Sequence, residues 1–246
     1  MTSDPREFTR YLSTHCAHLG DQGRYRERKK RQLLRTYAHL LPQRRDADLL
    51  EIGPGHGQWL EALRVDRGYS NAVAIDISEE VVDFCNGVLP GSTTLVSDTV
   101  EFLIRRPGCF ERIFVFHVLE HVPRGEQARL LAAILGSLKP GGLCLIEVPN
   151  MANAWIAAFL RYGDFTHETG FTELSMRQLL TSCGFADVRC FEERVDVRDP
   201  RGLLAGAFRQ LMGACQRFVY RGYQIPVPAV LTPALCTSAS RPHPAP

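Results

Sequence analysis

The residues of this chain that are suited to chemistry follow short apolar runs. After Leu49-Leu50 comes Glu51-Ile52-Gly53-Pro54-Gly55-His56-Gly57, in which an acid precedes three glycines at alternate positions. Glycine has no Cβ and readily adopts a positive φ, so this backbone can turn sharply and lie against a ligand. Acids also close the next two apolar runs, at Asp76 and Asp98. The pattern predicts a small-molecule site beyond the carboxyl ends of parallel strands.

Two histidine-containing segments are suited to proton transfer. His117 to Pro123 directly follows the fourth apolar run, and Tyr162 to Thr172 lies in a later insertion. A neutral histidine accepts a proton near pH 7. His167 is therefore the first candidate for a general base and His121 the second, and a purely structural hydrogen bond is the alternative for each. The candidates for contact with the substrate are polar residues in or just before the insertion: Asn150, Tyr162, Asp164 and Glu168.

Strand-like and helix-like segments must alternate to position these residues. The apolar runs predict strands over 48–52, 72–75, 93–97, 112–116, 143–148 and 188–191. Helical spacing and capping residues predict helices over 58–63, 99–105, 126–138 and 172–183, and Ser78 is expected to cap another. Such alternation is typical of an α/β fold, a doubly wound and mainly parallel sheet with helices on both faces.

The glycine segment resembles that of class I S-adenosylmethionine-dependent methyltransferases, as do Leu119-Glu120-His121-Val122 and Leu138-Lys139-Pro140-Gly141-Gly142. The likeness covers about residues 46–192 and implies a Rossmann-like sheet of seven strands. The last, antiparallel strand would fall in 225–236, whose three prolines favour an edge position. A nicotinamide fingerprint is disfavoured, because its third glycine would stand where Gln58 stands.

The resemblance also implies S-adenosyl-L-methionine as the cofactor and assigns its contacts. The loop glycines would let the backbone pass under the methionine part and the ribose, and Glu51 would help to hold the loop and the amino group of the cofactor. Asp76 would accept hydrogen bonds from the ribose hydroxyls, and Ile77 would pack on the adenine. Asp98 and Thr99 would meet the adenine amino group, and the backbone of His117 the methionine end. The full cofactor set is Glu51, Gly53, Gly55, Gly57, Asp76, Ile77, Asp98, Thr99 and His117.

The acceptor is suggested by Asp164–Thr172, which resembles methyltransferases found with polysaccharide and glycolipid assembly. This implies O-methylation of a sugar hydroxyl, on a polysaccharide, glycolipid or nucleotide-linked intermediate. A quinone-precursor or natural-product O- or N-methyltransferase is one alternative. A cofactor-binding scaffold without turnover is another. No metal is expected, because the acids show no ligand spacing.

Two flanking segments complete the predicted organisation of a 1–45 leader, a 46–199 core with insertion 150–171, and a 200–246 tail. The leader carries seven cations between Arg24 and Arg35, which form either a solvated face or a contact for a phosphate-bearing substrate. Tyr25 and Arg28 would lie over the cofactor, as in related enzymes. In the tail, 201–222 forms a basic amphipathic helix without acids, suited to a membrane surface, a homodimer interface or the protein's own core.

The composition excludes several classes. A net charge of +2 over 246 residues gives no argument for nucleic acid. The eight cysteines form no C-x-x-C pair, which disfavours zinc ligation and suits a reduced, cytoplasmic protein. No apolar leader or 18-residue apolar run is present, so a cytoplasmic enzyme, monomeric or homodimeric, is expected, with any membrane contact at the inner face.

Overall fold

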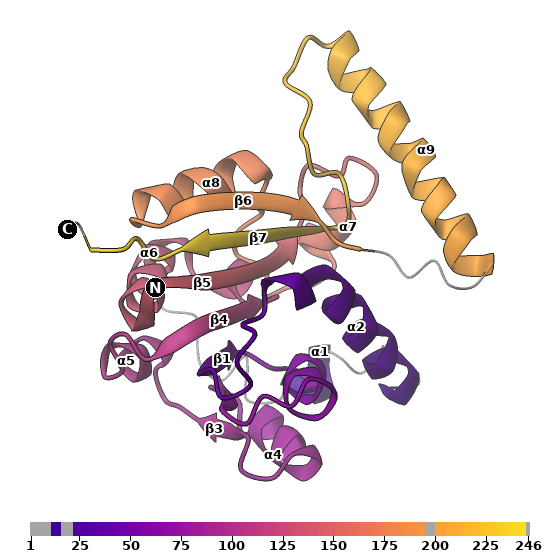
Figure 1. Ribbon diagram of the computed structural model, residues 1–246. Helices are drawn as coiled ribbons and strands as arrows, with labels where there is room; N and C mark the ends of the chain where they lie inside the picture. Colours follow the sequence, from indigo (N-terminus) through magenta and orange to yellow (C-terminus); the bar gives the residue numbers. More distant parts are fainter. Residues whose placement is uncertain (1–10, 16–21, 195–199, 245–246) are drawn as a thin grey trace.

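A single twisted sheet of seven strands organises the chain (Figure 1). The structure is a computed structural model that describes residues 11–15, 22–194 and 200–244. The strand order is β3-β2-β1-β4-β5-β7-β6. Strands β1 to β5 pair in parallel, and β7 is antiparallel to both β5 and β6. The expected doubly wound, mainly parallel seven-stranded sheet is thus confirmed. The strands are β1 Leu49–Ile52, β2 Ala72–Asp76, β3 Thr93–Leu95, β4 Phe110–Phe116, β5 Leu138–Pro149, β6 Ala186–Glu192 and β7 Ala234–Ser240.

Helices alternate with these strands close to the positions that the sequence predicts. The long or capped ones are α2 Gln22–Tyr37, α4 Glu79–Val88, α5 Thr99–Ile104, α6 Arg124–Ser137, α8 Glu173–Ser182 and α9 Pro200–Gly222. The shorter ones are α1 Tyr11–His15, α3 Gln58–Glu61 and α7 Ala157–Tyr162, with the 3₁₀ turns η3 Ala38–Leu40 and η5 Leu119–His121 and the π-helical turn η4 Ala62–Asp66.

The central strands have apolar side chains on both faces. Along β4, Ile113 and Val115 belong to one buried cluster, which includes residues of α5, α6 and α8. Phe114 and Phe116 belong to the other, together with Tyr37 of α2 and residues of α3. Because successive residues of a strand point to opposite faces, one apolar run supplies both cores. Parallel strands buried in this way read in the sequence as continuous apolar runs.

The last strand corrects one expectation. It lies at 234–240, not at 225–236, and it is enclosed between β5 and β6, not at an edge. Pro226, Pro228 and Pro233 all precede it, so none removes a hydrogen bond from the sheet. The Pro- and Ser-rich composition near the end of the tail predicts fraying, but residues 234–240 form this buried strand. Its sequence Ala-Leu-Cys-Thr-Ser-Ala-Ser has mostly small, weakly apolar side chains. The hydrophobic pattern therefore does not predict a strand here, although all seven residues are buried.

The helix caps behave as expected at one of two places. Thr172 begins α8 with a capping box, in which its side chain and that of Ser175 bond to each other's backbone N–H. Ser78 precedes α4 without a side-chain cap, and its buried hydroxyl has no partner among the described residues. Ser78 N–H instead donates to Asp76 Oδ1 at 2.8 Å. The carboxylate, not the serine, therefore organises this turn.

The two flanking helices differ in how they meet the core. Helix α2 buries Leu33 and Tyr37 against the sheet. Helix α9 lies at the periphery of the molecule (Figure 1), and its buried contact is polar: Gln216 Nε2–H donates to the carbonyl of Ala152. Among the described helices, none is both long enough and apolar enough to span a bilayer.

Candidate cofactor and catalytic site

A cavity of about 710 Å³ opens at the carboxyl ends of β1, β2 and β4. Strand β1 pairs with β2 on one side and with β4 on the other, so the strand order reverses there. Parallel sheets place ligands at this reversal point, because the loops that leave the two strands diverge to opposite faces. All the predicted cofactor residues except Gly57 line the cavity: Glu51, Gly53, Gly55, Asp76, Ile77, Asp98, Thr99 and His117.

The glycine loop needs its glycines for different reasons. All three have a positive φ, between 54° and 70°. A Cβ on Gly53 would lie 2.5 Å from Val118 Cγ2, so no side chain fits between the loop and the segment after β4. A Cβ on Gly55 would meet nothing within 4 Å, because this glycine faces the open cavity. Gly57 has a different place from the one expected: it precedes α3 and shapes the turn without lining the cavity.

Glu51 is a buried acid that the protein leaves incompletely satisfied. It is 3% exposed, and its Oε2 has no hydrogen-bond partner among the described residues. Burial, with a smaller contribution from the charge of Asp76, raises the pKa of Glu51 to about 8. An orphaned buried oxygen at a cavity wall fits a ligand that donates a hydrogen bond, such as an ammonium group.

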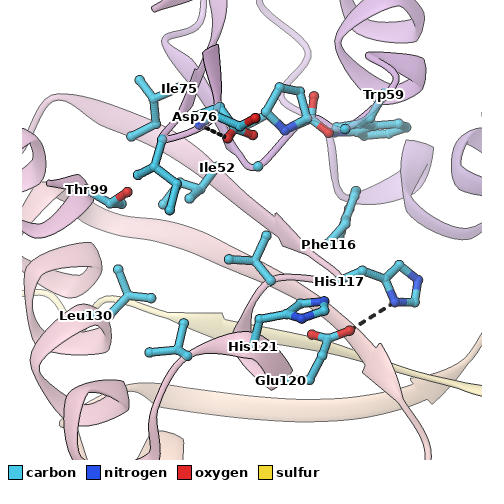
Figure 2. Close-up of a pocket in the computed structure, with 18 of the residues that line it drawn as sticks. Ile52, Trp59, Ile75, Asp76, Thr99, Phe116, His117, Glu120, His121 and Leu130 are labelled. Carbon is cyan, nitrogen blue, oxygen red and sulfur yellow. Dashed lines mark hydrogen bonds and ion pairs between the residues drawn. The ribbon is translucent and has the colours of Figure 1, made fainter. Parts of the chain in front are cut away.

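Asp76 ends β2 and lies on the side of the pocket that also holds Ile75 and Trp59 (Figure 2). Its Oδ1 accepts from Ser78 N–H, and burial raises the pKa of its carboxyl group to about 6. The group is therefore ionised at neutral pH and can accept hydrogen bonds from hydroxyls. Ile77 beside it is 44% exposed and offers an apolar surface to a ring.

Asp98 has a structural role as a helix cap, which the sequence did not lead us to expect. Its Oδ1 accepts from Val100 N–H at 2.7 Å and from Glu101 N–H at 3.1 Å, so it caps α5. Its Oδ2 lies 3.8 Å from a guanidinium nitrogen of Arg129. The cap fixes the carboxylate beside Thr99 at the cavity wall, where both residues can still meet a ligand.

His117 contributes its side chain as well as its backbone. It has a φ of 55°, and its ring is held by two acids: Nδ1 lies 3.2 Å from Glu120 Oε1 and Nε2 lies 3.1 Å from Glu147 Oε1. Burial disfavours the charged ring, but these hydrogen bonds outweigh it and raise the pKa of His117 to about 9. The ring is therefore a cation at neutral pH, and both of its N–H groups donate.

Glu147 and Lys29 are site residues that the sequence analysis missed. Glu147 is fully buried on β5, where Lys29 Nζ approaches its Oε1 to 2.6 Å and Tyr37 O–H donates to its Oε2 at 2.9 Å. Burial disfavours its charge, but Lys29 and His117 more than compensate and lower the pKa of Glu147. A lone acid within the apolar run Leu143–Val148 was the sequence feature that could have revealed it.

The two candidate bases meet in space although they are 46 residues apart. The ring centroids of His121 and His167 are 4.7 Å apart, and both rings line the cavity. His121 Nδ1 lies 2.8 Å from Thr166 Oγ1, which donates to Asp164 Oδ1 at 2.7 Å. His167 Nδ1 lies 2.8 Å from the carbonyl oxygen of Leu160. Burial lowers the pKa of His121, which favours its neutral, proton-accepting form.

Only one of the four predicted substrate residues lines the cavity. Asp164 lines the cavity. Asn150 does not: it is fully buried, and its amide donates to the carbonyls of Val230 and Thr232. Tyr162 is 79% exposed and lies outside the cavity, beside Arg161. Glu168 is exposed outside the cavity, and only its backbone N–H reaches the site, at the carbonyl of Glu120. Asn150 therefore has a structural role in place of the predicted substrate contact, whereas contact of Tyr162 or Glu168 with the substrate stays a prediction.

The basic leader is largely paired with acids of this protein. Arg26 and Lys30 both contact Glu61, at 2.8 and 3.2 Å, and Lys30 also contacts Asp66. Tyr25 lines the cavity as expected, whereas Arg28 is exposed outside it. These pairs attach α2 to the core, so the reading of this helix as a contact for a phosphate-bearing substrate loses its support.

Comparison with known proteins places the chain. A family model described as a methyltransferase domain matches residues 24–189. No curated protein sequence matches the chain. A solved S-adenosylmethionine-dependent methyltransferase from Archaeoglobus fulgidus is 20% identical, with a TM-score of 0.65 over 87% of this chain and 94% of that one. A possible histamine N-methyltransferase from Thermotoga maritima is 14% identical, with a TM-score of 0.65 over 96% and 99%.

A third similar structure is a phosphoethanolamine N-methyltransferase from Haemonchus contortus, solved with S-adenosylhomocysteine. It is 16% identical, with a TM-score of 0.62 over 98% of this chain and 61% of that one. These likenesses show a shared fold, and the family model covers two thirds of the sequence. The chain belongs to the methyltransferase-domain family, and it is an enzyme whose cofactor is S-adenosylmethionine.

Proposed function

We propose that this enzyme transfers a methyl group to a hydroxyl of a sugar or sugar-containing intermediate. The observation that supports this is the pair His121–His167 at the cavity wall, with Asp164 and Thr166 behind His121. An alkyl hydroxyl is a weak nucleophile and needs a base near it, unlike a phenolate or a free amine. The resemblance of Asp164–Thr172 to methyltransferases of polysaccharide and glycolipid assembly points to the same acceptor class.

The hydrogen bonds favour Nε2 as the proton-accepting nitrogen of each histidine in this proposal. A carbonyl oxygen only accepts, so His167 Nδ1 must carry the proton that it shares with Leu160, and its lone pair is on Nε2. Thr166 Oγ1 donates to Asp164 and accepts from His121 Nδ1–H, which likewise places the lone pair of His121 on Nε2. The cofactor supplies an activated methyl group. The acceptor proton passes to an imidazole Nε2 as the new oxygen–carbon bond forms and the methyl carbon–sulfur bond breaks, which releases S-adenosylhomocysteine.

A small amine is the second candidate acceptor. One of the similar structures is named a possible histamine N-methyltransferase, and another is named a phosphoethanolamine N-methyltransferase. Glu120 and Asp164 provide carboxylates at the cavity that suit an ammonium ion. A quinone precursor or other natural product would need less apparatus for proton transfer, and a scaffold without turnover would need none.

Methyl transfer to a panel of acceptors tests the proposal. Release of S-adenosylhomocysteine is measured with nucleotide sugars, oligosaccharides, lipid-linked sugars, phenols and small amines. His167→Ala should lower turnover at least about a hundredfold, because a positioned base contributes that much. Its affinity for S-adenosylhomocysteine should stay within a factor of two, and His39→Ala, an exposed histidine, serves as the matched control. Normal turnover by His167→Ala would refute the assigned base, and preference for amines would replace the acceptor class.

We also propose that α9 brings the enzyme to an anionic lipid surface, where glycolipid substrates reside. Six large apolar side chains on one side of the helix are at least 46% exposed: Leu203, Leu204, Phe208, Leu211, Phe218 and Val219. The segment 200–225 contains no acid, and Tyr223 and Ile225 extend the exposed apolar surface. Such a helix suits the interface between lipid and water, at the inner face of a membrane for a cytoplasmic enzyme.

A further inference from the structure

One cluster at the cavity has the composition of a metal site. Glu120, His121 and His167 each offer one ligand atom within 4.8 Å of those of the other two. Donors bound to one ion at about 2.1 Å can lie at most about 4.2 Å apart, so adjustments of well under 1 Å would bring the three onto a common ion. Glu120 and His121 are buried, and the half-buried His167 closes the cluster from the insertion after β5.

Glu120 supplies the observation that points to a ligand. It is 1% exposed, and its Oε2 has no hydrogen-bond partner among the residues that the structure describes. Its other oxygen accepts from His117. A carboxylate oxygen buried without a partner costs free energy, and binding a cation there would remove that cost. In Figure 2 the carboxylate lies on the same side of the pocket as His121, across from Asp76 and Trp59.

Each member of the cluster also has an outer partner that fixes its orientation. His121 Nδ1 is held by Thr166, His167 Nδ1 by the carbonyl of Leu160, and Glu120 Oε1 by His117. Metal-binding histidines in proteins nearly always donate the second ring N–H in this manner, so that the other nitrogen offers its lone pair to the ion. The cluster thus shows the ligands and their supporting shell together.

We propose that Glu120, His121 and His167 bind a divalent transition-metal ion at the acceptor end of the cavity. Two imidazoles and one carboxylate suit ions such as Zn²⁺, Co²⁺, Mn²⁺ or Fe²⁺, whereas Mg²⁺ and Ca²⁺ prefer oxygen ligands only. Three protein ligands leave a coordination position for the acceptor oxygen. Its binding to the ion would lower the pKa of the hydroxyl and release its proton to solvent. The oxygen would then form a bond to the methyl carbon as the carbon–sulfur bond breaks, with S-adenosylhomocysteine as the leaving group.

This catalytic use of the ion rests on the proposed function, but the site itself does not. The metal site makes the imidazoles of His121 and His167 ligands of the ion in place of proton acceptors. Metal dependence separates these two roles, since a histidine base works after chelation and a metal-activated hydroxyl does not.

The test is a Co²⁺ titration of the full-length, chelator-treated enzyme, followed by visible absorption. We expect one equivalent to bind and Zn²⁺ to displace it. Glu120→Gln and His167→Ala should each weaken binding by more than the roughly 10–100-fold that loss of an outer partner costs, and Thr166→Val by about that factor. His39→Ala, which removes an exposed histidine, should bind like the wild type. Titration with S-adenosylhomocysteine shows that each variant is folded.

Two results would overturn the site: no Co²⁺ binding by the wild type, or equal binding by His167→Ala and His39→Ala. If Glu120→Gln loses both Co²⁺ and S-adenosylhomocysteine binding, that variant is misfolded. The Co²⁺ affinities of His167→Ala and Thr166→Val then test the site in its place. Equal methyl transfer by metal-free and Co²⁺-loaded enzyme would refute the ion's catalytic role, and a histidine base would remain the mechanism. Co²⁺ binding without transfer to any acceptor would refute the proposed function and leave the site.

Discussion

At the scale of single residues, the buried acids of the cavity fall into two groups. Glu51 and Asp76 have raised pKa values because burial disfavours their charge and no cation among the described residues compensates it. Glu147 has a lowered pKa because Lys29 and His117 both pair with it. Glu51 and Asp76 line the cavity where a cationic, hydroxyl-bearing cofactor is expected. Glu147 lies behind the cavity wall and holds Lys29 and His117 in place. Glu51 and Asp76 therefore have the capacity to bind a ligand, whereas the charge of Glu147 is already compensated within the protein.

Glu51→Gln should stabilise the protein without cofactor at alkaline pH. The pKa of Glu51 in the folded state is about 8, above its ordinary 4.5, so folding takes up a proton between these values. Stability from this residue is therefore lost as pH rises from about 4.5 to 8. Glutamine keeps the shape and stays neutral, and we expect a gain of a few kcal/mol in the free energy of unfolding at pH 8.5, up to the roughly 5 kcal/mol that a shift from 4.5 to about 8 corresponds to. Urea titrations at pH 5 and 8.5 measure it.

The same variant should show no gain at pH 5, where Glu51 is already protonated in the folded protein. Its affinity for S-adenosylmethionine should fall, because a neutral amide cannot attract an ammonium group. Equal destabilisation at both pH values would show that Glu51 is held in its charged form by a partner.

Asp76 should make cofactor affinity depend on pH. Its pKa is about 6, and only the ionised carboxylate accepts two hydrogen bonds from hydroxyls. The affinity for S-adenosylhomocysteine should be constant above pH 7 and fall as pH drops through 6. Asp76→Asn should lose about tenfold or more at pH 7.5, the worth of a hydrogen bond to a charged group. Calorimetry from pH 5 to 8 should show this dependence in the wild type and a flat profile in Asp76→Asn.

At the scale of elements, the glycine loop and the segment after β4 are fitted to each other. Gly53→Ala adds two costs, the strain of a positive φ and the contact with Val118. Gly91→Ala adds only the first, because its φ is 68° and its Cβ would meet nothing within 4 Å. Strain alone costs about 1 kcal/mol. Gly53→Ala should therefore destabilise the protein more than Gly91→Ala in chemical denaturation, by about 1–3 kcal/mol, the usual cost of overpacking.

A double variant isolates the contact. Val118→Ala removes the methyl group that Gly53→Ala would strike, so it should recover the excess loss and leave the strain. If Gly53→Ala and Gly91→Ala prove equally destabilised, the loop has room that the present packing does not show.

The motif-bearing elements were predictable because their residues adjoin along the chain. The acid, the glycines and the strand that carries them lie within nine residues, and local rules place them together. The pairing of His121 with His167 depends on where the insertion folds back, and the role of Glu147 depends on α2 crossing the ends of the strands. Asn150 shows the opposite error: a polar residue after a strand was assigned to a ligand, yet it binds the carbonyls of the segment before β7.

The sheet itself followed from hydrophobic runs, and its weakest prediction was β7. Runs of Val, Ile, Leu and Phe identify β1, β2 and β4, which are buried on both faces. Strand β7 is buried too, but it consists mostly of Ala, Ser, Thr and Cys, whose burial is driven by neighbours on either side and not by their own hydrophobicity. Tertiary pairing decides such a strand, and no local pattern reports it.

At the scale of the whole molecule, α9 docks with the side that amphipathic helices usually turn outward. Arg209 pairs with Glu193 and Arg217 approaches Glu192, while Gln216 is buried against Ala152. The apolar side therefore faces away from the core. Helix α9 thus docks on the protein's own core through its polar side, and its apolar face stays uncovered. Large exposed apolar surfaces on soluble proteins usually mark a contact with a partner or a membrane.

Replacing that face should release the enzyme from lipid without changing its chemistry. Leu204→Ser with Phe208→Ser removes two residues that are 73% and 61% exposed, so the fold should be unaffected. Burial of one such side chain contributes roughly 1.5–3 kcal/mol, so the partition coefficient onto anionic vesicles should fall at least about tenfold. Co-sedimentation with phosphatidylglycerol vesicles measures it, with Leu174→Ser, an equally exposed leucine on α8, as the control. If the wild type stays in solution and is a dimer that the double variant dissociates, α9 is an interface between two copies and the lipid proposal is wrong.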